Sequence, residues 1–110
     1  MPLEATLRIV GAREARQLNR AFRRKDYATN VLSFPYEKSR GDVVLCHPVI
    51  AREARRQGKA LAAHYAHLVL HGLLHLRGYG HEKKREAQRM EGAEIRLLAR
   101  AGFGNPYTVE

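Results

Sequence analysis

The sequence predicts an α+β protein, in which helices pack on a small mixed β-sheet around one central, buried helix. Three short β-prone segments are followed by three helical ones, and one of these helices is apolar over most of its circumference. The 110 residues, 45% of them hydrophobic and 28% charged, are enough for one packed core and too few for two. We therefore expect a single domain over residues 1–110.

Three segments predict the strands of the sheet: residues 5–10, 30–34 and 42–47. The first alternates, with Leu7 and Ile9 on one face, which is typical of a half-buried strand. The other two end at Pro35 and Pro48, because proline cannot donate a hydrogen bond to a ladder. A polar turn of hairpin length separates them, so we expect these two strands to pair antiparallel.

Helical periodicity begins at Ala12, and three further helices are predicted over residues 48–57, 59–76 and 83–101. Gly58 and Gly102 follow two of these segments, where a left-handed residue ends a helix. The 59–76 helix carries apolar side chains nearly all round, which indicates burial. We expect it to be the central helix, with the sheet on one side and other helices on the rest.

The chain is strongly basic, with 20 Lys and Arg against 11 Asp and Glu and a formal charge of +9. This charge favours a polyanionic partner, with nucleic acid or the ribosome as the first candidate. Cys46 is the only cysteine, so no internal disulfide can form. We find neither a signal peptide pattern nor a membrane-spanning run, and a cytoplasmic location without a membrane partner is the expectation.

The central helix carries four histidines in one narrow stripe: His64, His67, His71 and His75. His71 and His75 lie one turn apart, which lets both rings reach one zinc ion. Gly78 can turn the chain so that His81 returns to the same point. Three imidazoles leave a fourth position for water, so the spacing predicts one catalytic zinc ion per chain.

The same spacing occurs in the metzincin protease signature, H-E-x-x-H-x-x-G-x-x-H, with one difference. Gly72 stands in the place of the glutamate that serves as general base. Without this carboxylate the protease mechanism lacks its proton acceptor. A zinc peptidase therefore remains the less favoured alternative.

The run from His71 to His81 resembles the YbeY family of bacterial rRNA-maturation endoribonucleases, whose metal motif reads H-G-x-L-H-L-x-G-Y-D-H. Further blocks resemble that family in its order along the chain: residues 18–26, 29–35, 41–42 and 105–107. The resemblance extends from about residue 5 to residue 107. Several blocks in sequence are more specific than a single motif.

The resemblance implies a single-strand-specific, zinc-dependent endoribonuclease that matures the 3′ end of 16S rRNA and acts in ribosome quality control. Its partners would be ribosomal RNA and the small ribosomal subunit, with a ribosome-associated GTPase or a ribosomal protein as a further candidate. By position, His71, His75 and His81 match the zinc ligands, and Arg23 matches an arginine that is needed for activity near the metal. Lys25 lies in the same block, but no role is carried over to it.

Two departures from the family are visible. Gly80 stands where the motif usually has Asp, which removes a carboxylate beside the third ligand. The chain also begins near the family's second strand, so we expect a smaller sheet with an exposed edge.

The predicted catalytic residues are Arg23 and His71. Zinc would activate water and polarise a phosphoryl oxygen, while Arg23 would hold the phosphate. Without the resemblance, Arg23 is one more member of a basic stripe on its helix, and a core role for His67 is favoured over proton relay. The nucleophile, either water or the RNA 2′-hydroxyl, stays open. The alternative outside enzymes is a non-catalytic, metal-stabilised ribosome-assembly or RNA-binding factor.

Overall fold

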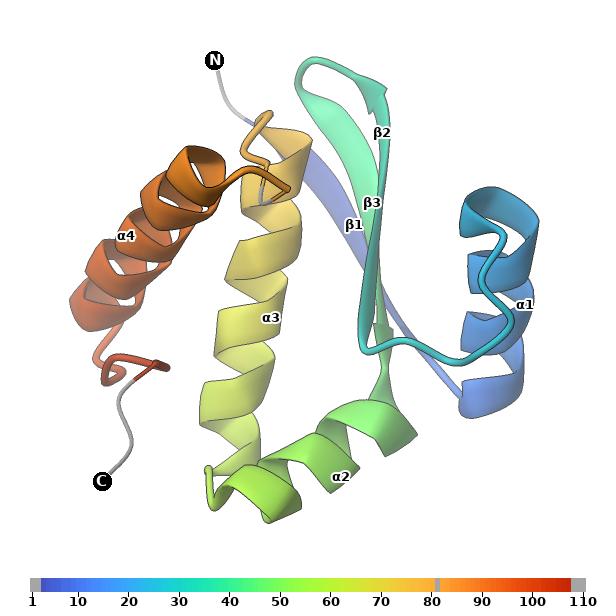
Figure 1. Ribbon diagram of the computed structural model, residues 1–110, viewed down its shortest axis with the longest axis horizontal. Coiled ribbons are helices and arrows are strands. Elements are labelled where there is room, and N and C mark those ends of the chain that lie inside the picture. Colours follow the sequence, from blue (N-terminus) through green and yellow to red (C-terminus); the bar gives the residue numbers. More distant parts are fainter. Residues whose placement is uncertain (1–2, 81, 108–110) are drawn as a thin grey trace.

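The computed structural model describes residues 3–80 and 82–107 and confirms the α+β class (Figure 1). Over these ranges a three-stranded sheet combines with four helices. In chain order the elements are β1 (Glu4–Val10), α1 (Ala12–Arg23), β2 (Val31–Glu37), β3 (Arg40–Cys46), α2 (His47–Gln57), α3 (Leu61–Leu76) and α4 (Lys84–Arg100). None of the helices in the described ranges is long and apolar enough to cross a membrane.

The sheet is mixed, as predicted, with the strand order β1-β3-β2. β1 pairs parallel with β3, and β2 pairs antiparallel with β3. The prediction that Pro35 ends β2 is wrong, because the strand continues to Glu37 and Pro35 pairs with Gly41. β2 lies at an edge of the sheet, where one side of the strand needs no hydrogen-bond partner, so a proline is tolerated.

The remaining boundaries differ from the prediction by one or two residues. His47 belongs to α2 rather than to the strand before it, and α3 begins at Leu61 because Ala60 has an extended backbone. Gly58 and Gly102 have φ values of 66° and 90°, the left-handed conformation expected of them.

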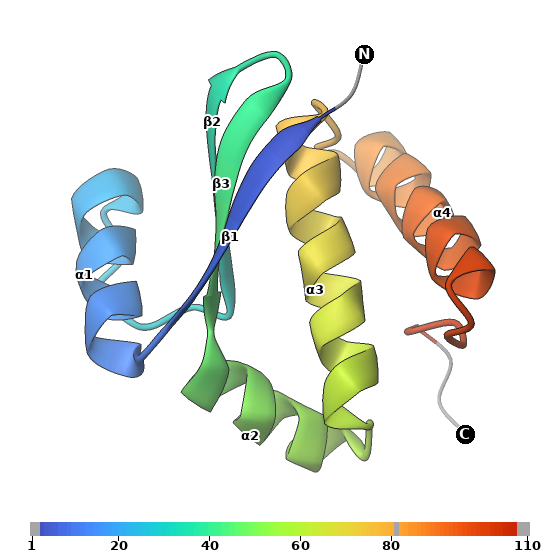
Figure 2. The same cartoon turned by 180° about the vertical axis from the view of Figure 1, so that it is seen from behind.

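The sheet lies between two helical layers (Figures 1 and 2). α1 covers one face, α3 covers the other, and α4 packs on the side of α3 that faces away from the sheet. Each face has its own core cluster. The α1 side buries Val10, Ala15, Leu32, Val44, Cys46 and Val49, and the α3 side buries Val43, Leu45, Ile50, Leu68 and Leu76.

β1 is not the half-buried strand that its alternation predicts. Leu7 and Ile9 are 49% and 67% exposed, although Val43 and Leu45, their partners on β3, are buried. The reason is the placement of α3, which packs against β2 and β3 and leaves this face of β1 uncovered. β1 and β2 are the two edge strands of this sheet.

The prediction that neighbours surround α3 is also only partly right. Leu68, Leu74 and Leu76 are buried between the sheet and the other helices. A further stretch of α3, from Leu61 to Leu70, instead lines an open apolar groove together with the end of α4. The core is thus continuous at the C-terminal half of α3, the part that carries the histidine pair.

Candidate metal and nucleic-acid site

The four histidines of α3 lie along one side of the helix, as the spacing predicts. The ring centroids of His64 and His67 are 6.3 Å apart, and those of His67 and His71 are also 6.3 Å apart. The rings of His71 and His75 are closer, at 4.8 Å. The last two histidines are therefore the pair best placed to share one ion.

His71 and His75 line a cleft of about 650 Å³, and Arg23 lines the same cleft. The structure thus brings together three of the predicted site residues, although Arg23 is 48 positions before His71 in the sequence. His81, the third predicted ligand, lies outside the described residues. Gly78 has φ 94°, so the turn that was predicted after the helix does form.

Arg23 owes its place to the end of α1. Arg24 takes the left-handed conformation, with φ 58°, and ends the helix directly after Arg23. The following loop is fixed to α1 because the buried Asn19 amide donates to the Tyr27 carbonyl at 2.8 Å. In addition, Arg16 binds Asp26 through two hydrogen bonds of 2.8 and 3.0 Å. This ion pair lowers the pKa of the Asp26 carboxyl.

The loop also brings aromatic side chains to the cleft. Phe22 and Tyr27 both line it and are 68% and 53% exposed. Sequence analysis gave neither residue a role in the site. Their exposure beside the histidines offers flat apolar surfaces to a ligand.

Gly72 faces the sheet and not the cleft. A Cβ atom at this position would lie 2.6 Å from Cγ1 of Val43, and Ser33 Oγ donates to the Gly72 carbonyl at 3.1 Å. The helix therefore approaches the strands here more closely than any side chain allows. The glycine that replaces the protease glutamate has a packing role, and a carboxylate could not be accommodated.

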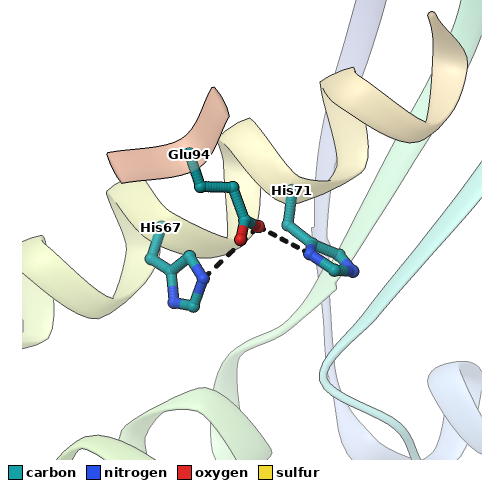
Figure 3. A group of neighbouring side chains, drawn as sticks. All are labelled: His67, His71 and Glu94. Carbon is teal, nitrogen blue, oxygen red and sulfur yellow. Dashed lines mark hydrogen bonds and ion pairs between the residues drawn. The ribbon is translucent and has the colours of Figure 1, made fainter. Parts of the chain in front are cut away.

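Glu94 of α4 is a buried carboxylate that sequence analysis missed (Figure 3). Its Oε2 atom lies 2.7 Å from Nδ1 of His71 and 3.4 Å from Nε2 of His67. The Tyr107 hydroxyl donates a short hydrogen bond to Oε1. The signal in the sequence was an acidic residue within the apolar face of a helix, next to Ala93 and four residues after Met90.

The surroundings keep Glu94 ionised. Burial by itself raises the pKa of its carboxyl, but hydrogen bonds from His67, His71 and Tyr107 outweigh burial and lower the pKa to about 2. Burial and the bond to Glu94 raise the pKa of the Tyr107 phenol, so the phenol keeps its proton. The site thus holds one fixed negative charge behind the histidines.

Among the described residues, the group that could hold a metal ion consists of His67, His71 and Glu94, whose ligand atoms lie within 4.8 Å of one another. It shares His71 with the predicted set and differs in the other members. Imidazole is a ligand that zinc prefers, and the rings of two histidines one helical turn apart, such as His67 and His71, can reach the same zinc ion. The residues present therefore fit a metal ion beside His71.

The fold and the cleft define a small α+β protein whose site joins the central helix, the end of α1 and the sheet edge. The chain belongs to the endoribonuclease YbeY family, whose model matches residues 1–102.

Relatives that carry the name endoribonuclease YbeY are similar over almost the whole chain. One from Aromatoleum aromaticum is 58% identical over 107 residues, covering 94% of this chain and 70% of its own length. Another, from Methylibium petroleiphilum, is 53% identical over 110 residues, covering 97% of this chain and 74% of its own. A solution structure from Thermotoga maritima has a TM-score of 0.58 at 27% identity and covers 96% of this chain and 79% of that one.

Proposed function

We propose that the chain is a zinc-dependent endoribonuclease that cleaves single-stranded RNA. The observation that carries the proposal is the cleft that Arg23 shares with His71 and His75. Endoribonuclease is also the name of the relatives that are 51–58% identical. The cleft combines imidazoles, which bind a metal ion, with a guanidinium, which binds phosphate through paired hydrogen bonds.

Zinc would be held by His71, His75 and His81, and when bound it supplies an activated water and a Lewis acid for the phosphoryl oxygen. Arg23 would bind the scissile phosphate and stabilise the charge that develops on it. Phe22 and Tyr27 offer their exposed rings for stacking with unpaired bases, which favours a single strand over a duplex.

The described lining of the cleft includes no carboxylate, and this supports RNA as the substrate in two ways. Because no carboxylate is among these lining residues, none of them carries a negative charge that would repel a polyanion, and the formal charge of +9 on the whole chain attracts one. A zinc peptidase would need a general base, and Gly72, the position of that base in proteases, faces Val43 of the sheet. These observations support the nuclease over the peptidase.

We further propose that the natural substrate is the rRNA of the small ribosomal subunit, with maturation of the 16S 3′ end and ribosome quality control as the roles. A ribosome-associated GTPase or a ribosomal protein would guide the enzyme there. Depleting the chain in cells should lead to 16S precursors with unprocessed 3′ ends, measured by end mapping. Normal 3′ ends after depletion would leave the nuclease without this role.

The central test compares cleavage of three substrates by the zinc-loaded protein: a single-stranded RNA, its duplex and casein. We expect cleavage of the single strand only, lost in His75→Ala and reduced by at least a hundredfold in Arg23→Ala. Arg13→Ala is the matched control, since it removes an exposed arginine of α1 that does not line the cleft. Cleavage that survives His75→Ala would contradict the proposal, whereas RNA binding without cleavage would favour the assembly factor.

A further inference from the structure

Glu94 is a fully buried carboxylate on α4, and its side chain lies against the ring of His71 on α3 (Figure 3). A buried charge is costly unless its hydrogen-bonding capacity is used. Here each oxygen of Glu94 accepts a hydrogen bond from a different residue: Oε2 from His71 and Oε1 from Tyr107. The carboxylate is therefore held at both oxygens and cannot rotate freely.

We infer that Glu94 is a positioning residue, which fixes the ring of His71 so that a zinc ion is bound through Nε2. The inference rests on the proposed function, because it takes His71 as a zinc ligand. At 2.7 Å from Oε2, the Nδ1–H group of His71 donates a hydrogen bond to the carboxylate. This bond selects one tautomer, the one whose Nε2 carries the lone pair.

The distances favour hydrogen bonding over direct ligation by Glu94. Ligand atoms bound tetrahedrally to one zinc ion at roughly 2.1 Å lie about 3.4 Å apart. The 2.7 Å between Nδ1 of His71 and Oε2 of Glu94 is the length of a charge-assisted hydrogen bond. The group of His67, His71 and Glu94 is accordingly a hydrogen-bonded support, and Nε2 of His71 would be the atom that holds a zinc ion.

His67 and Tyr107 complete this support. Nε2 of His67 lies 3.2 Å from the Tyr107 hydroxyl and 3.4 Å from Oε2 of Glu94. Tyr107 belongs to the segment after α4, and the Lys59 ammonium donates to the carbonyl of the neighbouring Pro106 at 2.8 Å. The C-terminal segment is thus tied to the start of α3 and holds the hydroxyl against Glu94.

Two measurements on the full chain test the inference. The first is zinc affinity, determined by competition with a chromophoric chelator. Glu94→Gln keeps the shape of the side chain and removes its charge, so we expect one zinc per chain at about 10- to 100-fold weaker affinity. Glu4→Gln, which makes the same change at an exposed glutamate of β1, should leave the affinity unchanged.

Tyr107→Phe removes one donor and keeps the carboxylate, so its effect should have the same direction and be smaller. A loss of zinc in Glu94→Gln as complete as in His71→Ala would make Glu94 a ligand and overturn the inference. Unchanged affinity in Glu94→Gln would also overturn it, as would absence of zinc binding by the unmodified chain.

The second measurement is the tautomer of the His71 ring, read from nitrogen chemical shifts in the metal-free protein. We expect the proton on Nδ1 in the unmodified chain and a mixture of tautomers in Glu94→Ala, with circular dichroism showing that the variant folds. A proton on Nε2 in the unmodified chain would contradict the inference. If zinc affinity and tautomer behave as expected but RNA is not cleaved, the proposed function fails and the positioning role stands.

Discussion

Replacing Gly72 by alanine tests whether α3 packs on the sheet as closely as the structure shows. The added Cβ would lie 2.6 Å from Cγ1 and 3.1 Å from Cγ2 of Val43, a side chain without exposed surface. Ser33 Oγ would lie 3.2 Å away. Val43 belongs to the buried core cluster on this face, so a shift of its side chain would disturb close-packed neighbours.

The expected change in the free energy of unfolding is the balance of two effects. Overpacking of a tight core costs about 1–3 kcal/mol. Alanine in a helix interior stabilises by about 1 kcal/mol relative to glycine. Because the overlap is with a fully buried side chain, we take the upper half of the overpacking cost, about 2–3 kcal/mol, and expect Gly72→Ala to destabilise by about 1–2 kcal/mol. The melting temperature should fall by about 4–8 °C for each kcal/mol of stability lost.

The assay is equilibrium urea unfolding at a fixed zinc concentration, because a bound ion adds its own stabilisation. Gly92→Ala on α4 is the matched control. Its Cβ would meet only the mobile end of Arg96, at 3.3 Å, so this variant should be about 0.5–1 kcal/mol more stable than the unmodified chain. Two helical glycines should thus respond with opposite sign.

A double-mutant cycle identifies the cause. Val43→Ala removes both methyl groups that the new Cβ would meet, so adding Gly72→Ala to it should cost nothing further. The coupling energy should be at least about 1 kcal/mol. A Gly72→Ala variant as stable as the unmodified chain, or one that Val43→Ala does not relieve, would refute the close packing of α3 on β3.

Three other predictions concern the site. Gly80→Asp should destabilise the protein by about 1 kcal/mol in urea unfolding, because its Cβ would lie 2.7 Å from Oε2 of Glu86. Oε1 of the same Glu86 accepts a hydrogen bond from the Lys83 amide at the start of α4, and the clash would disturb this cap. Combining Gly80→Asp with Glu86→Ala should remove the clash, and an unchanged unfolding midpoint for Gly80→Asp alone would contradict the contact. Tyr27→Ala should weaken single-stranded RNA about tenfold in fluorescence anisotropy, whereas Tyr36→Ala, at an exposed ring that does not line the cleft, should not. RNA affinity should fall steeply with salt, with a logarithmic slope of about −0.7 for each phosphate contact on a single strand, and a flat salt dependence would argue against the basic surface.

The parts of the site that sequence analysis predicted are those that one helix fixes by itself. Histidines at positions 71 and 75 share a face in any regular helix, and Gly78 ends α3 in the expected way. Arg23 is different, since its helix gives it only a place in a basic stripe. Its approach to His71 depends on the loop that Asn19 fixes, and only the family resemblance pointed to it before the structure did.

The same limit explains the error on β1. Alternation of apolar residues reports which face of a strand is apolar, but burial requires a neighbour that covers that face. The neighbour is α3, and its lateral position over β2 and β3 is set by the close approach at Gly72. Leu7 and Ile9 therefore stay exposed although their pattern is that of a core strand.

Gly72 was first interpreted as the absence of a catalytic group, and the structure gives it a positive role. A glutamate at this position would be directed at Val43, so a general base could not be restored there by substitution. The acidic group that the site does contain, Glu94, comes from another helix and binds Nδ1 of His71 from behind. A carboxylate in that place would orient His71 as a zinc ligand rather than take a proton from the substrate, which agrees with the proposed mechanism, in which zinc would activate the water and Arg23 would hold the phosphate.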